Sequence, residues 1–169
     1  SWAAAGLTGI TNSATPFITA LGSGAAANTT GVQNTATGYG TLNSNITGSS
    51  NVAIGYNAGI NFNTYNDCVL IGVNADTSIN GLTNAIAIGS GAIAGASNTL
   101  ILGNGCNVGI GTSTPDAPLQ FANTLVNRKI VLSETANNNH QIYGFGVNSG
   151  ILRYQVDNTT SSHVFYAAT

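Results

Sequence analysis

The sequence predicts an all-β protein, in which a parallel β-solenoid is followed by a small β-rich domain. Three observations support this fold class. Asn, Thr, Ser and Gly make up 80 of the 169 residues, only 5% are charged, and the 43% of hydrophobic residues is too high for a disordered chain. A glycine-centred repeat runs through the first two thirds of the chain. Composition then shifts, because all three basic residues follow residue 115.

The repeat is anchored by six glycines spaced 16, 17, 17, 17 and 14 residues apart. They are Gly22, Gly38, Gly55, Gly72, Gly89 and Gly103. The residues one and three positions before each glycine are Leu, Ile, Val or Thr, and the residue two positions before is mostly Ala. This period-2 alternation predicts one strand of about five residues per repeat, with aliphatic side chains on one face and Ala on the other.

A corner is expected after each strand, because the second residue after all six glycines is Gly or Asn. These two residue types tolerate a positive φ angle, which a left-handed turn requires. A stretch of small residues follows, such as residues 25–27 or 92–94. Strand, corner and small-residue stretch together form one coil of a β-solenoid, whereas Asn, Gly and Thr disfavour a helical repeat.

The predicted solenoid is thin. Six coils stacked about 4.8 Å apart give a rod of about 29 Å with exposed ends and an Ala-lined interior. A monomeric rod of this kind protects its strand edges poorly. We therefore expect side-by-side oligomerisation, in which the Ala face of each chain lets neighbours approach closely.

The domain boundary is expected where two prolines punctuate residues 115–118. The first domain, residues 1–115, holds repeats at about 12–106, and a connector covers 107–118. The second domain is residues 119–169.

Short strands are expected in this second domain, near residues 119–122, 129–134, 140–147, 150–156 and 163–168. The Asn-Ser-Gly sequence at 148–150 is expected to form a hairpin turn. About 50 residues bury too little surface to be comfortably stable alone, so we expect a trimeric, β-prism-like knob.

Specific motifs link the chain to known fibre proteins. Residues 51–58, N-V-A-I-G-Y-N-A, resemble the head repeats of trimeric autotransporter adhesins. The run from 34 to 57 is similar to repeats in fibre proteins of tailed phages, large DNA viruses and some predatory bacteria. Residues 108–115, V-G-I-G-T-S-T-P, resemble a connector of tail-fibre-type proteins, and residues 128–168 look similar to a module of the same group.

The resemblance, which covers about residues 12–106, implies a left-handed parallel β-roll that assembles as a homotrimer. It also implies host or prey recognition outside the cell, on a virion fibre or on a bacterial surface.

Composition excludes several other functions. Three basic residues and a net charge of -2 cannot neutralise a phosphate backbone, so nucleic-acid binding is not expected. The longest apolar stretch, residues 86–96, is broken by three glycines and is far shorter than the ~20 residues of a membrane span. The columns contain no repeated Asp for calcium and no Thr-x-Thr ladder of the ice-binding kind.

An enzyme is not expected. No motif places His140 or His163 beside a nucleophile or an acid, and Glu134, Asp116 and Asp157 are too scattered for a glycan depolymerase. The two histidines could bind a divalent ion together with Asp157, although surface or turn positions are the commoner role for such residues. No metal or other cofactor is therefore expected.

The two cysteines, Cys68 and Cys106, match no metal or redox spacing. They fall in the fourth and sixth coils, about 10 Å apart along the rod, which is beyond the reach of a disulfide. We expect free thiols that are buried as small apolar side chains.

Candidate ligand-binding residues gather in the second domain. Aromatic faces pack against the C–H surfaces of sugars and planar polar groups fix their hydroxyls, and this segment concentrates both beside nearly all the charge. The candidates are His140, Gln141, Tyr143, Arg153, Tyr154, Gln155, Asp157 and His163. Strand parity puts the two tyrosines on apolar faces, where a core role is the stronger alternative, and puts Arg153, Gln155 and His140 on the opposite, surface-facing parity.

These observations favour a segment of a homotrimeric fibre that attaches to a cell surface, with a tip that binds a glycan or an envelope protein. The alternative is a structural spacer whose receptor-binding part lies beyond Thr169. The absence of Met and the strand-like end at 164–168 lead us to expect a piece of a longer chain.

Overall fold

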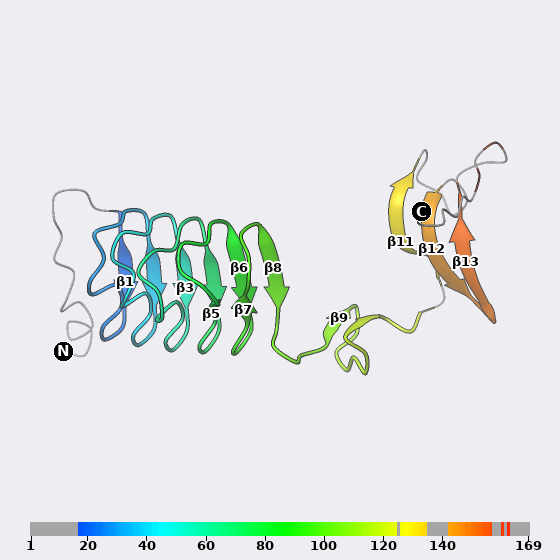
Figure 1. The fold of residues 1–169 in the computed structure, drawn as a ribbon. Helices are drawn as coiled ribbons and strands as arrows, with labels where there is room; N and C mark the ends of the chain where they lie inside the picture. The colour runs from blue at the N-terminus through cyan, green and yellow to red at the C-terminus, as the bar shows by residue number, and fades with distance from the viewer. Residues whose placement is uncertain (1–16, 125, 135–141, 157–159, 161, 163–169) are drawn as a thin grey trace. The chain divides into compact units, whose positions relative to one another are not determined.

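The computed structural model describes residues 17–124, 126–134, 142–156, 160 and 162. Within these residues the protein is all-β and has no helix, as predicted (Figure 1). The chain divides into two compact units, Ser1–Val108 and Gly109–Thr169, and the division falls inside the expected connector.

The first unit is a parallel β-solenoid (Figure 1). Its main sheet has six strands in the order β1-β2-β3-β4-β6-β8, and every pairing is parallel. The strands are β1 Thr19–Leu21, β2 Thr35–Thr37, β3 Val52–Ile54, β4 Val69–Ile71, β6 Ala85–Ile88 and β8 Thr99–Leu102. A second, two-stranded sheet pairs β5, Asp76–Thr77, with β7, Ile93–Ala94.

The register confirms the predicted columns. Ala36 pairs with Ala53, which pairs with Leu70, so that equivalent positions of successive coils lie side by side. The corner prediction also holds, because the second residue after each of the six column glycines has a positive φ, from 54° at Asn57 to 71° at Gly24.

The interior of the solenoid is narrow and lined by small side chains. The positions two before the column glycines point inward, and Ala36, Ala53, Leu70 and Ala87 are completely buried. The Ala-lined interior is therefore confirmed. The expectation that the Ala face contacts neighbouring chains is wrong, because a side chain inside the coil cannot reach another molecule.

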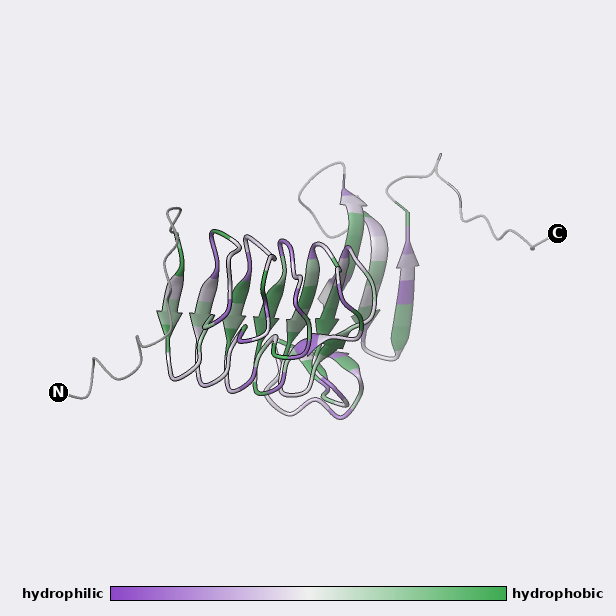
Figure 2. Ribbon diagram, turned by 60° about the vertical axis from the view of Figure 1, so that its left-hand side comes forward, coloured by the Kyte–Doolittle hydropathy of each residue, from purple (hydrophilic) through white to green (hydrophobic). Residues whose placement is uncertain are grey.

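The larger aliphatic side chains point outward instead. Figure 2 shows hydrophobic residues concentrated along the strands of the solenoid sheet. Leu21 is 58% exposed, Leu100 55%, Leu102 46%, Ile54 41% and Ile88 37%. These side chains have the outward parity of their strands, so the sheet presents an apolar outer surface, which we call the aliphatic face.

A buried asparagine ladder closes one corner of the coils. Asn51 Nδ2 donates to Asn34 Oδ1 at 2.9 Å and to the carbonyl of Tyr65 at 2.6 Å. Asn51 Oδ1 accepts from the backbone N–H of Cys68, which occupies the same column one coil further on. Both amides are buried with partners, as buried polar groups require.

Both cysteines are free thiols, as predicted. Cys68 is completely buried, and its thiol donates to the carbonyl of Asn66 at 3.2 Å. Cys106 differs from the expectation, because it is exposed near the end of the repeats.

Two small sheets follow the solenoid. β9, Val108–Ile110, begins at the last residue of the first unit and pairs with β10, Leu119–Phe121. β11, Val126–Glu134, β12, Ile142–Asn148, and β13, Ile151–Gln155, form an antiparallel sheet. Asn148 pairs with Ile151 across a two-residue turn in which Gly150 has φ 71°, so the predicted hairpin is confirmed. The strand expected at 163–168 lies outside the described residues.

Candidate functional site

The structure describes four of the eight candidate residues predicted in the second unit, Tyr143, Arg153, Tyr154 and Gln155. The other four, His140, Gln141, Asp157 and His163, lie outside the described residues.

Three of the described candidates come together. Tyr143, Tyr154 and Gln155 line a hollow of about 220 Å3 over β12 and β13. Phe145 lies opposite Tyr154 in the register, and the two rings meet edge to face with centroids 5.2 Å apart. Arg153 lies opposite Gly146 and does not line this hollow.

The exposure of side chains in the second unit differs from the pattern that strand parity predicted. Tyr154 is 61% exposed and Leu152 62%, whereas Arg153 and Gln155 are partly buried. Leu132, which lines the same hollow, is 70% exposed. In the single chain, the three-stranded sheet therefore exposes an apolar surface to solvent.

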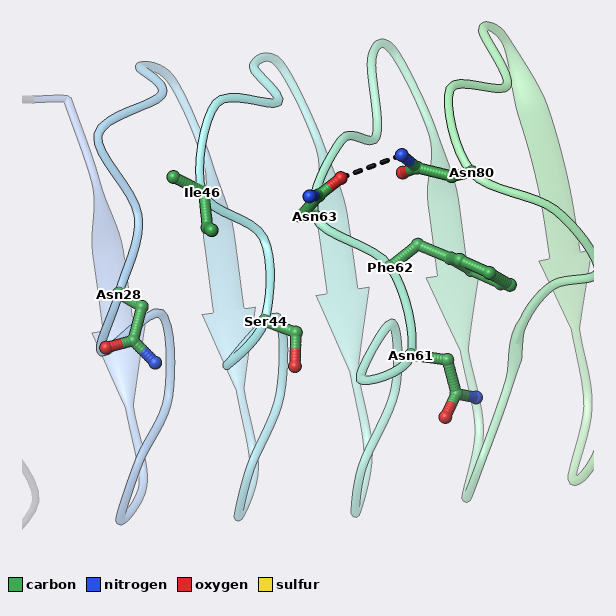
Figure 3. Close-up of a pocket in the computed structure, with 7 residues that line it drawn as sticks. All are labelled: Asn28, Ser44, Ile46, Asn61, Phe62, Asn63 and Asn80. Carbon is green, nitrogen blue, oxygen red and sulfur yellow. Dashed lines mark hydrogen bonds between the residues drawn. The ribbon is translucent and has the colours of Figure 1, made fainter.

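A second candidate site lies on the solenoid and was not anticipated from the sequence. It is a groove of about 430 Å3 whose lining contains four amide side chains. The lining residues are Asn28, Ser44, Ile46, Asn61, Phe62, Asn63 and Asn80. Figure 3 shows them on the loop segments that cross in front of the six-stranded sheet. We call this site the amide groove.

The groove arises from the stacking of coils. Asn28, Ser44 and Asn61 each follow a column glycine by six residues. Ile46, Asn63 and Asn80 each follow one by eight residues. Both sets line the same groove on the loop side of the coils (Figure 3). The signal that could have found the groove was therefore this pair of same-parity columns.

A buried carboxylate holds the floor of the groove in place. Asp76, 1% exposed, accepts from the side-chain and backbone N–H groups of Asn61 at 2.7 and 3.2 Å, and from the hydroxyl of Tyr65 at 2.7 Å. The Tyr65 oxygen in turn accepts from the backbone N–H of Phe62 at 2.9 Å. Burial, followed by the hydrogen bond to Asp76, raises the pKa of Tyr65 well above its ordinary value.

The groove itself carries no titratable side chain. Asn80 Nδ2 donates to Asn63 Oδ1 at 2.7 Å (Figure 3). Asn80 Oδ1 accepts from the backbone N–H of Thr64. These bonds hold neighbouring coils together and fix the orientation of the amides. The arrangement suits a ligand that is recognised by neutral hydrogen bonds.

An exposed aromatic pair lies elsewhere on the solenoid. Tyr39 and Tyr56 occupy the same column, one coil apart, with ring centroids 5.5 Å apart and planes 11° from parallel. They are 58% and 52% exposed. Each ring covers one face of the other, so the stack is explained by coil spacing alone.

Among the described residues, no three His, Cys, Asp or Glu side chains lie close enough together to hold a metal ion. The part of the chain that the structure describes contains no helix long and apolar enough to cross a membrane. Comparison of the chain with protein-family models, with curated proteins and with solved structures finds no match. The functional interpretation therefore rests on the repeat and on the geometry above.

Proposed function

We propose that the chain is a segment of a homotrimeric fibre that attaches to cell surfaces outside the cell of origin. Its C-terminal unit serves as a tip that recognises a glycan or an envelope protein of a host or prey cell. No catalytic step is part of this function.

The aliphatic face is the observation that carries the proposal. Monomeric soluble proteins rarely expose large contiguous apolar patches. Here Ile54, Ile88 and Leu102 repeat on the outer surface of one sheet, each at least 37% exposed. A surface of this kind is best covered by another copy of the same chain, because an identical rod presents the same coil spacing. The number three comes from the resemblance to trimeric adhesin and fibre repeats.

The second unit supports the same assembly. Its three-stranded sheet exposes Leu132, Leu152 and Tyr154, each to at least 61%. A unit of about 60 residues is poorly stabilised by its own core, so sister copies would bury surface that the single chain leaves in water.

The molecular mass in solution tests the assembly. We expect three times the 17.0 kDa of the chain in sedimentation equilibrium. Ile54→Asp places a charge on the aliphatic face and is expected to shift the mass towards the monomer. Ile46→Asp is the matched control, because Ile46 has a similar exposure, 45% against 41%, but lies on the loop side of the coil. A monomeric wild-type protein contradicts the assembly.

Glycan-array binding tests the recognition function. Signal that is lost in Arg153→Ala or Tyr143→Ala supports a receptor-binding tip. A folded trimer that binds neither glycans nor cells supports the alternative, a spacer within a longer fibre. Release of oligosaccharides from envelope material would show an enzyme instead.

A further inference from the structure

We propose that the amide groove is a binding site for an uncharged oligosaccharide on the flank of the solenoid. This site is distinct from the tip, and its existence does not depend on the tip being a receptor-binding element. It gives the rod itself a recognition surface.

The first argument is the hydrogen-bonding capacity that the protein leaves unused in the groove. Asn61 directs its Nδ2 towards Asp76, because a carboxylate only accepts, and so its Oδ1 faces outward as an acceptor. Asn63 uses Oδ1 to accept from Asn80, which leaves its Nδ2 as a donor. No described residue bonds to either remaining group. Sugar hydroxyls both donate and accept, so they complement this mixed pair.

Asn28 adds a further acceptor at the end of the same column. Its Nδ2 donates to the backbone carbonyl of Asn43 at 3.0 Å, and its Oδ1 has no donor among the described residues. Asn28 and Asn61 lie two coils apart, about 10 Å along the rod, and Ser44 stands between them in the same column. A row of amide and hydroxyl groups at coil spacing suits a ligand with repeating units better than a compact metabolite.

The second argument is rigidity. The Asp76 and Tyr65 network fixes Asn61 through its side chain and backbone and fixes Phe62 through its backbone. Amides that are held in place lose little conformational entropy when a ligand binds. The network thus acts as a positioning device for the groove.

The third argument is the mixture of polar and apolar lining. Ile46 is 45% exposed on the groove wall, and Phe62 contributes a partly buried ring (Figure 3). Sugar rings have apolar C–H surfaces as well as hydroxyls, and such sites combine apolar contacts with a few placed polar groups. The volume of about 430 Å3 lies in the usual range of ligand sites, about 300 to 1,000 Å3.

Charge decides the class of sugar. The lining carries no cationic side chain, so it offers no partner for a sulfate, phosphate or carboxylate group. The nearby carboxylate of Asp76 is buried and engaged by several N–H and O–H donors, which argues against a cation site. Asp76 would also repel an anionic sugar. The expected ligand is therefore neutral.

The groove stays accessible in the proposed fibre. Its residues lie on the loop side of the coils, whereas the aliphatic face lies on the six-stranded sheet (Figure 3). Association through that sheet leaves the loop side in water.

Isothermal titration calorimetry of the full chain with maltohexaose, cellohexaose, mannohexaose and chitohexaose tests the inference. We expect at least one of these neutral hexasaccharides to bind with an affinity that does not change with salt, and hyaluronan hexasaccharide not to bind. The double variant Asn28→Ala/Asn63→Ala removes two groove contacts and is expected to weaken binding about ten-fold. Asn104→Ala, an exposed amide on the last coil, is the matched control and should bind as the wild type does.

Side-chain amide NMR of the wild-type protein provides a readout that does not depend on the folding of a variant. The bound hexasaccharide should shift the amide resonances of Asn61 and Asn63 and leave that of Asn104 in place. Failure of all four hexasaccharides to bind overturns the inference, as does binding that the double variant leaves unchanged. Binding that falls only in Arg153→Ala would also overturn it, while leaving the proposed tip intact.

Discussion

Replacing Tyr65 by Phe tests the buried network that supports the amide groove. The ring is completely buried, and its hydroxyl bridges Asp76 and the backbone N–H of Phe62. Phe keeps the ring and removes only the hydroxyl. The variant thus leaves the partly buried N–H of Phe62 without its partner and deprives a buried carboxylate of one donor.

The expected loss follows from these two bonds. A hydrogen bond to a charged group contributes about 1.5 to 3 kcal/mol, and a buried unsatisfied N–H costs about 1 to 3 kcal/mol. Asp76 Oδ1 still accepts a hydrogen bond from the backbone N–H of Thr77, so the loss of the Tyr65 hydroxyl costs the carboxylate an energy at the lower end of the first range. We therefore expect Tyr65→Phe to lower the free energy of unfolding by about 3 kcal/mol, and Tm by about 6 to 12 °C.

Thermal and guanidinium denaturation at one fixed protein concentration measure this loss, since oligomerisation makes Tm depend on concentration. Tyr39→Phe is the control, because Tyr39 is 58% exposed and its substitution should change the free energy by no more than about 0.5 kcal/mol. If the two variants are equally stable, the network does not hold the groove floor and the reasoning is refuted.

Three further predictions follow from the solenoid. Because burial and the hydrogen bond to Asp76 raise the pKa of Tyr65, the neutral phenol stabilises the folded state fully below about pH 10, and this stabilisation is lost as pH rises further. In denaturation curves measured at increasing pH, Tyr65→Phe should lose less stability above about pH 10 than the wild type does. The exposed Cys106 should react with a thiol reagent in the folded protein, and the buried Cys68, whose pKa burial raises, only after unfolding; equal rates would contradict the burial. Gly55→Ala should lower the free energy of unfolding by about 2 kcal/mol more than Gly81→Ala does. The angle φ is positive at both sites, but only at Gly55 would an added Cβ meet a carbonyl oxygen of the next coil, 2.5 Å away. Equal denaturation midpoints of the two variants would exclude that close approach.

The strands and corners of the solenoid could be predicted because they depend on local backbone chemistry. Asn57 and Gly40 stand where the chain must adopt a positive φ, and few other residue types do so readily. Which face points inward was harder. Alternation separates Ala53 from Ile54, but the inward column also holds Leu70, so side-chain size alone does not show which face points inward.

The sequence analysis missed the amide groove because its parts lie in different coils and its two columns mix residue types. Asn61 is held by Asp76, fifteen residues away, through contacts that only coil stacking creates. Its column also holds Ser44, so no repeated residue type marks the position. The tip candidates were easier to name from composition, but only the register shows that Tyr143, Tyr154 and Gln155 meet at one hollow.

A single coil of this solenoid carries two chemically opposite surfaces. Ile54 lies on the sheet side and Asn63 on the loop side, nine residues apart in the same repeat. Small side chains such as Ala53 line most of the interior, and the exposed aliphatic side chains of the strands, such as Ile54 and Ile88, lie on the sheet side. The loop side keeps the neutral amides that face water. Stacking further coils of this kind would lengthen both surfaces together, so that the proposed assembly and the proposed ligand recognition could change independently through substitutions on opposite sides of the same repeat.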